Sequence, residues 1–113
     1  MNYGVITTES FERKIKYFSK KYHSFLDDLE VFKQELLKNP TMGEDLGNDT
    51  RKVRMAIASK NKGKSGGARI ITYHIIVNIV YTKIFLLTIY DKGEQKSISK
   101  KEIQNLKEIN GLI

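Results

Sequence analysis

The sequence contains no cysteine and no tryptophan, and it has one proline and two histidines in 113 residues. The absence of cysteine excludes disulfides, thiol nucleophiles and cysteine-ligated metal, and it fits a reducing compartment such as the cytoplasm. The two histidines, His23 and His74, are too far apart in sequence to resemble a metal-ligand motif. We therefore expect neither a metal ion nor a cofactor.

The sequence also lacks a long hydrophobic run. The longest, Ile75 to Tyr81, is interrupted by Asn78 and is too short to span a bilayer. The N-terminal residues do not follow the charged-then-apolar plan of a signal peptide. A hydrophobic fraction of 40% and a single proline argue against disorder. These features predict one cytoplasmic domain over residues 1–113, with no membrane contact.

Acidic residues are absent from one stretch, Arg51 to Arg69, which carries seven cations. The whole chain has 20 Lys and Arg against 13 Asp and Glu, so the remaining 13 cations balance the acids, and the formal charge of +7 lies within this stretch. A fold does not require such segregation, because scattered charges keep a protein equally soluble. The pattern favours a polyanion as partner, and nucleic acid is the commonest one. A solvated basic loop without a partner is the alternative.

The first half of the sequence predicts a short strand and two helices. The strand is Tyr3 to Thr7, and Thr8 caps a helix whose apolar residues recur at spacings of three and four: Phe11, Ile15, Phe18 and Tyr22. Ser24 and Asp27 form a possible capping pair for a second helix, which ends at Asn39 because Pro40 follows. Residues 41–49 contain two glycines and are expected to form a loop.

From Arg51 the hydrophobic period changes to two, which predicts strands. Val53, Met55 and Ile57 point one way, while Lys52 and Arg54 point the other. After a glycine- and lysine-rich loop over residues 60–67, apolar runs predict strands at about 68–77 and 84–90, joined by a weakly marked turn over 78–83. This turn is either a hairpin with an exposed apolar tip or a continuation of the strands.

A final short helix follows Ser99, which forms a capping box with Glu102. The element order is therefore β-α-α-β-β-β-α. It predicts an α+β fold in which an N-terminal strand and a helical hairpin pack on a mostly antiparallel sheet of about four strands. If the alternation holds, Lys52, Arg54 and Arg69 lie on the sheet face away from the helices.

Cations gathered on a sheet face can cleave RNA without a metal ion. The 2′-OH of RNA is an internal nucleophile, and cleavage needs alignment, stabilised phosphoryl oxygens and a group that moves protons. Arginine suits the phosphate because its planar fork donates two hydrogen bonds. Lys52, flanked by Arg51 and Arg54, is a candidate base if neighbouring cations lower its pKa. A surface that binds phosphates without cleaving them is the alternative.

Three segments resemble the RelE/ParE toxin superfamily, and most closely its HigB-like and phage-derived RelE branch. They read RKVR from Arg51, KGKSGGARIITY from Lys62 and LLTIYDKGE from Leu86. The upstream NPTMG turn and the downstream serine-capped helix keep the same order. The resemblance implies a toxin of a bacterial type II toxin–antitoxin module, which cuts mRNA in the ribosomal A site and leaves a 2′,3′-cyclic phosphate.

The resemblance also implies a catalytic set of Lys52, Arg54, Arg69 and Lys92, in which Arg69 binds the scissile phosphate. The family's C-terminal tyrosine falls near Ile98 and is absent, so Tyr73 or Tyr90 is a possible substitute for its stacking or proton-transfer role. Further cations are expected to contact mRNA or rRNA phosphates: Arg51, Lys60, Lys62 and Lys64.

The implied partners are the ribosome, mRNA and a cognate antitoxin that covers the basic face. The antitoxin is expected to be acidic or amphipathic, with a HigA-like helix-turn-helix protein as one candidate, and operator DNA is contacted only through the complex. Two other functions stay open. One is inhibition of DNA gyrase in the manner of ParE, because a shared fold does not fix function. The other is a non-catalytic basic module that binds nucleic acid.

Overall fold

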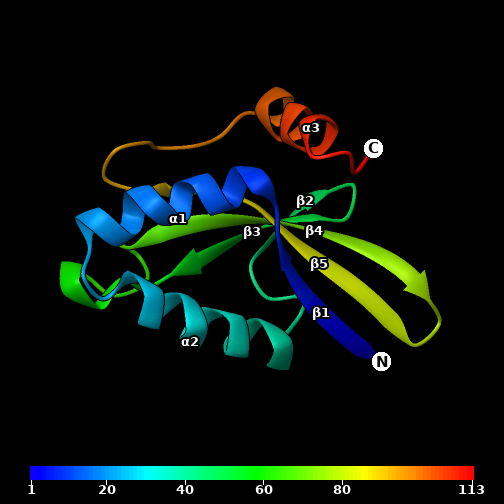
Figure 1. Ribbon diagram of the computed structural model, residues 1–113, viewed down its shortest axis with the longest axis horizontal. Coiled ribbons are helices and arrows are strands. Elements are labelled where there is room, and N and C mark those ends of the chain that lie inside the picture. The colour runs from blue at the N-terminus through cyan, green and yellow to red at the C-terminus, as the bar shows by residue number, and fades with distance from the viewer.

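The computed structural model describes residues 1–113 and forms a five-stranded sheet with helices on both faces (Figure 1). In chain order the elements are β1 (Asn2–Thr7), α1 (Glu9–Lys21), α2 (Phe25–Lys38), β2 (Glu44–Gly47), β3 (Thr50–Met55), a 3₁₀ turn (Ala58–Lys60), β4 (Ala68–Asn78), β5 (Tyr81–Asp91) and α3 (Lys100–Ile109). No helix is long and apolar enough to cross a membrane. The expected α+β architecture is confirmed.

The strands lie in the order β1-β5-β4-β3-β2. The pairs β2–β3, β3–β4 and β4–β5 are antiparallel, and β1 alone runs parallel to its neighbour β5. The sheet is therefore mixed but mostly antiparallel, as the sequence predicts. A parallel pair needs a long connection, and α1, α2 and three strands separate β1 from β5 in the chain.

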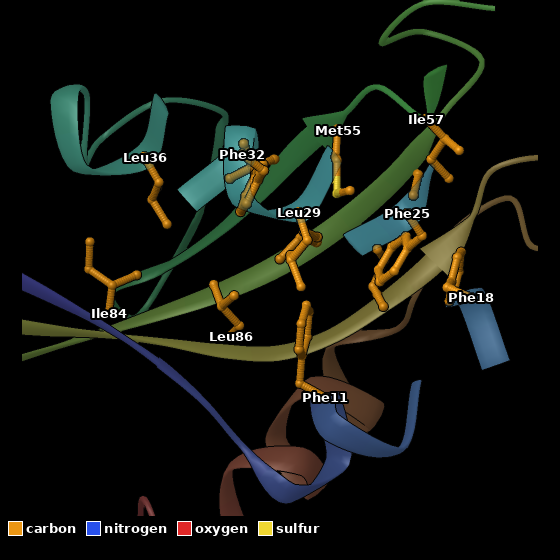
Figure 2. Packing of buried hydrophobic residues seen from close by; sticks show 14 residues of the cluster. Phe11, Phe18, Phe25, Leu29, Phe32, Leu36, Met55, Ile57, Ile84 and Leu86 are labelled. Carbon is orange, nitrogen blue, oxygen red and sulfur yellow. The ribbon is translucent and has the colours of Figure 1, made fainter. Parts of the chain in front are cut away.

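The two N-terminal helices cover one face of the sheet (Figure 1). Thr8 caps α1 as predicted, since its Oγ1 accepts a hydrogen bond from the backbone N–H of Phe11. Figure 2 shows aromatic and aliphatic side chains from α1 and α2 meeting those of the sheet. The buried residues of this core are Phe11, Phe18, Phe25, Leu29, Phe32, Leu36, Val53, Met55, Ile57, Ala68, Ile70, Ile84, Leu86 and Ile89.

The opposite face carries a smaller core beneath α3. Ile71, Leu87 and Tyr90 from the sheet pack with Ile103 of the helix, and Ile98 lies against this group. Ser99 caps α3 as predicted, because its Oγ accepts from the backbone N–H of Glu102 at 3.1 Å. The small apolar area leaves the rest of this face available to polar side chains.

Two local predictions are wrong. Residues 41–49 are not a plain loop, because β2 pairs with β3 through a two-residue turn at Asn48 and Asp49, both with positive φ. Such conformations suit tight hairpins. Ser24 does not form a capping pair with Asp27: its Oγ donates to the Asp28 carboxylate at 2.6 Å and accepts from the backbone N–H of Ser59.

The β4–β5 hairpin is longer than predicted. Its strands extend to Asn78 and from Tyr81, so the turn is Ile79–Val80 alone. The Asn78 side chain accepts a hydrogen bond from the backbone N–H of Val80 and replaces the usual glycine as the turn-forming group. Ile79 is 91% exposed, which confirms the apolar tip.

Candidate active site

A pocket of about 520 Å³ lies where β2, β3 and the start of β4 meet the loop before β4 and the turn after β5. Five cations and one acid contribute to its lining, and we call it the cationic pocket: Met42, Gly43, Glu44, Lys52, Val53, Arg54, Lys64, Arg69 and Lys92. All four residues of the expected catalytic set therefore line one pocket. They are brought together although Lys52 lies in β3 and Lys92 follows β5.

Arg54 and Arg69 are direct partners in the β3–β4 register. Two residues that oppose each other across antiparallel strands share a face, and two like charges in such a pair destabilise the sheet. Burial makes the repulsion more costly, and Arg69 is only 6% exposed. The pair is therefore poor for folding alone, and an anion placed between the two guanidinium groups would relieve the repulsion.

Backbone carbonyls hold the guanidinium of Arg69 in place. Its Nη1 donates to the carbonyl oxygens of Lys64 and Ala68 at 3.2 Å each, and its Nη2 donates to that of Ser65 at 3.1 Å. Arginine has five N–H donors, so these contacts leave donors for a bound anion. The loop of residues 61–67 thus positions Arg69 without neutralising its charge.

Close backbone packing brings the end of this loop against β3. A Cβ on Gly67 would lie 2.1 Å from the carbonyl oxygen of Met55, so only glycine fits. The carbonyl of Gly67 accepts from the backbone N–H of Lys92 at 3.2 Å. Gly67 therefore joins the loop, β3 and the residue after β5 at one point beside Arg69.

Two of the pocket lysines are paired with carboxylates of the chain. Lys52 Nζ lies 3.6 Å from Glu44 Oε1, and the two residues are register partners in β3 and β2. Lys64 Nζ lies 2.9 Å from Glu35 Oε2 on α2. Both carboxylates are substantially exposed, and exposed ion pairs of this kind contribute at most about 1 kcal/mol. A phosphate can therefore displace either carboxylate at low cost.

Lys60 is not part of the pocket. Its Nζ donates to Asp91 Oδ1 at 2.7 Å, and Asp91 also accepts hydrogen bonds from the Tyr22 hydroxyl and from the Gly93 backbone N–H at 2.8 Å. Burial raises the pKa of Asp91, but the hydrogen bonds from Lys60, Tyr22 and Gly93 outweigh it and lower this pKa to about 2. Lys60 therefore anchors the start of the loop to the end of β5.

The structure does not bring Arg51 or Lys62 to the pocket either. Alternation along β3 directs Arg51 away from Lys52, and its guanidinium lies 3.8 Å from Asp45 and 3.4 Å from the Gly43 carbonyl. Lys62 is exposed on the loop, where its side chain packs over Gly66. Of the four expected RNA contacts, Lys64 alone lines the cationic pocket.

Neither candidate tyrosine lines the pocket. Tyr90 is the register partner of Arg69, but its hydroxyl is buried and has no hydrogen-bond partner. Burial raises the pKa of Tyr90, and the charge of Arg69 acts in the opposite direction. Tyr73 lies beneath the ammonium of Lys107. Ile98 packs beside Tyr90 in the small core.

Sequence reasoning missed Glu44, the only acid in the pocket lining, and Asp91, the anchor of Lys60. Glu44 could have been found through the Asn48–Asp49 dipeptide, since both residues tolerate positive φ and their turn folds β2 back on β3. Asp91 gave no such indication, because its partners Lys60 and Tyr22 are remote in sequence. No group of three or more His, Cys, Asp or Glu is arranged to hold a metal ion.

A comparison with protein families agrees with this geometry. Residues 8–113 match the family model described as the RelE toxin of the RelE/RelB toxin–antitoxin system. The match includes every element except β1 and covers the whole cationic pocket. The chain therefore belongs to the RelE toxin family, whose members are the toxins of toxin–antitoxin pairs and have a cognate antitoxin as partner.

Proposed function

We propose that this toxin is a metal-independent endoribonuclease that cuts mRNA on the ribosome and so stops translation. The observation that carries the proposal is the opposed pair Arg54–Arg69. Arg69 is buried and Arg54 is exposed, and both line a pocket together with Lys52, Lys64 and Lys92. A dianionic, pentacoordinate phosphate is the group that such a cluster stabilises best. Donors held in place before the reaction are worth about 3–4 kcal/mol each in comparable sites.

The reaction transfers the phosphate within the RNA. The 2′-oxygen attacks the adjacent phosphorus, the O2′–P bond forms and the P–O5′ bond breaks, which leaves a 2′,3′-cyclic phosphate and a free 5′-hydroxyl. Arg54 and Arg69 hold the non-bridging oxygens. Glu44 takes the proton of the 2′-hydroxyl, and the Lys92 ammonium supplies one to the departing 5′-oxygen. Proton transfers of this kind contribute about 10²–10⁴-fold to the rate.

Glu44 replaces Lys52 as the base in this scheme. The Lys52 ammonium lies beside the Glu44 carboxylate, so the pair holds a charged donor and a charged acceptor. A carboxylate is the group of the two that accepts a proton without first losing one. Lys52 then orients Glu44 and adds positive charge near the phosphate.

The ribosome is the expected site of action because the pocket lacks an aromatic residue on which a base could stack. Tyr73 and Tyr90 lie outside its lining, and Ile98, near which the resemblance places the family tyrosine, belongs to the small core. The pocket can thus bind a phosphate, but it has no aromatic side chain that would align the attached nucleotide by stacking on its base. Alignment by an external scaffold would supply the missing part. A toxin that acts on the ribosome would work in the cytoplasm, and an acidic or helix-turn-helix antitoxin would cover the same cations.

The deciding experiment compares wild type with Arg69→Ala in a reconstituted translation reaction, with and without ribosomes. Primer extension maps the cuts, and end-group analysis identifies the cyclic phosphate. Arg13→Ala is the matched control, because Arg13 forms an exposed ion pair with Glu9 on α1. We expect in-frame cuts by wild type and Arg13→Ala with ribosomes only, and none by Arg69→Ala.

Circular dichroism shows whether Arg69→Ala is folded, and Arg69→Lys tests whether charge alone suffices. Undiminished cutting by a folded Arg69→Ala protein would contradict the proposal. If the wild type cuts nothing, inhibition of DNA supercoiling by gyrase would favour the ParE-like function. Salt-sensitive RNA binding without product would favour the non-catalytic module.

A further inference from the structure

A second pocket with cations in its wall lies between α3 and the β2–β3 turn. Figure 1 shows these two parts of the chain side by side. It has a volume of about 280 Å³, and we call it the α3 pocket. Three lysines and no acid belong to its lining: Leu46, Gly47, Asn48, Thr50, Lys100, Lys101, Ile103, Gln104 and Lys107. The cationic pocket does not share any of these residues.

Lys107 is the unusual member of this group, because it is only 4% exposed and takes part in no ion pair. Its Nζ lies 4.2 Å from the ring centroid of Tyr73, and its one hydrogen bond, to the Asn48 carbonyl, is long at 3.4 Å. Lysine is almost never buried without a counter-charge, since an ammonium has three donors to satisfy and a large solvation energy to recover. An anion in the α3 pocket would supply both.

Lys100 and Lys101 add to this positive potential in a place where helices usually carry acids. They occupy the first turn of α3, whose free N–H groups already give that end a partial positive charge. Lys100 and Lys107 are seven residues apart and therefore lie on the same side of the helix. Cations that oppose the helix dipole are unfavourable for the helix alone, and they favour an anion bound beside it.

Burial also lowers the pKa of Lys107, with the charge of Asp49 acting in the opposite direction. A bound anion would stabilise the charged ammonium further. Anion binding and protonation of Lys107 would therefore reinforce each other.

We propose that the α3 pocket binds a second phosphate of the RNA backbone, held by Lys107, Lys100 and Lys101, while the reacting phosphate lies in the cationic pocket. The short strand β2 links the two sites: Glu44 lines the cationic pocket, and Leu46 to Asn48 line the α3 pocket. An RNA strand that crosses β2 would meet both. The inference rests on the proposed function for its choice of RNA as the source of the phosphate.

The first test needs no catalysis. Inorganic phosphate is titrated into the full chain, and NMR follows the backbone amides and lysine side chains. We expect one set of saturable shifts around Arg54 and Arg69 and another around Asn48 and Lys107. Lys107→Met removes the charge but keeps an unbranched apolar stem, so it should abolish the second set alone and preserve the melting temperature.

Lys33→Met is the matched control, because Lys33 is a half-buried helix lysine outside both pockets. Lys100→Ser combined with Lys101→Ser is a second variant, in which both replaced residues are exposed. It should weaken the same set of shifts. Absence of phosphate-dependent shifts near Lys107 in the wild type would overturn the proposal. Equal behaviour of Lys107→Met and Lys33→Met would overturn it too.

The second test uses a short RNA with a 2′-deoxy nucleotide at the cleavage position, so that it binds without reacting. Lys107→Met should weaken binding several-fold and reduce the slope of log affinity against log salt by about 0.7, the value for one phosphate of a single strand. Lower affinity for the antitoxin with unchanged affinity for RNA would reassign the pocket to a protein partner and contradict the inference. A wild type that shows both sets of phosphate shifts but never cuts mRNA would refute the proposed function and leave the anion site standing.

Discussion

Lys60 Nζ and Asp91 Oδ1 lie 2.7 Å apart and join the start of the 61–67 loop to the last residue of β5. The Asp91 side chain is buried and that of Lys60 is 11% exposed, and Asp91 receives further hydrogen bonds from Tyr22 and from the Gly93 N–H. The residue after Asp91 is Lys92, whose backbone N–H reaches the carbonyl of Gly67. One carboxylate thus fixes both the loop that holds Arg69 and the strand end that presents Lys92.

Removing the lysine of this pair should destabilise the protein. Lys60→Met leaves the Asp91 charge buried without its closest cation, and breaking a buried pair in this way costs about 3–5 kcal/mol. We expect a loss near the lower end, because Tyr22 and Gly93 remain. The double variant Lys60→Met with Asp91→Asn should cost less than the sum of the two single changes, as measured by urea unfolding. Strict additivity would show that the two side chains do not interact.

Stability should also fall in acid through Asp91. Its folded pKa is about 2, below the ordinary value of 3.8. A carboxyl group with a lowered folded pKa contributes stability above its unfolded pKa and loses that contribution as the pH falls through the folded value. For Asp91 the window runs from roughly pH 4 to pH 2, and the contribution is about 2 kcal/mol.

Urea unfolding of wild type and Asp91→Asn over this range isolates the effect, because the other carboxyl groups titrate in both proteins. The difference in unfolding free energy should shrink as the pH falls. A constant difference down to the lower end of the window would mean that Asp91 keeps no lowered pKa in the folded state.

The sequence predicted the cations on the strands better than those in the loop. Alternation along β3 placed Lys52 and Arg54 on one face, and the Gly66–Gly67 pair marked Arg69 as the opening of β4, so local periodicity sufficed. Lys60, Lys62 and Lys64 are equivalent by composition. They differ only through partners remote in sequence, Asp91 for Lys60 and Glu35 for Lys64. Such partners follow from packing, which periodicity does not describe.

Glu44→Gln should separate the proton acceptor from the phosphate-binding cations. The amide keeps the size of the side chain but cannot take the 2′-hydroxyl proton, so the cleavage rate should fall about 10²-fold or more while ribosome binding changes little. Single-turnover cleavage of ribosome-bound mRNA provides the measurement.

Asp45→Asn is the matched control for this change, because Asp45 is the neighbouring acid on β2 and is paired with Arg51 outside the pocket. It should leave the cleavage rate intact. A Glu44→Gln enzyme with the wild-type rate would remove Glu44 from the reaction and return the role of base to Lys52.

Gly67→Ala should damage the site through the backbone. The new Cβ would lie 2.1 Å from the Met55 carbonyl oxygen and 3.2 Å from the Cα of Ala56, and both neighbours are backbone atoms that cannot rotate away. The loop end must therefore move off β3, which breaks the Lys92–Gly67 hydrogen bond and displaces Arg69 from Arg54. Misplacement by about 1 Å can cost on the order of 10²-fold in rate.

Gly93→Ala is the control, since its Cβ would meet only side-chain atoms, the nearest at 3.3 Å. Hydrogen exchange at the Lys92 amide reports the displacement independently of cleavage: it should accelerate in Gly67→Ala and remain slow in Gly93→Ala. Unchanged exchange together with lost cleavage would show that Gly67 acts in some way other than by holding the loop against β3.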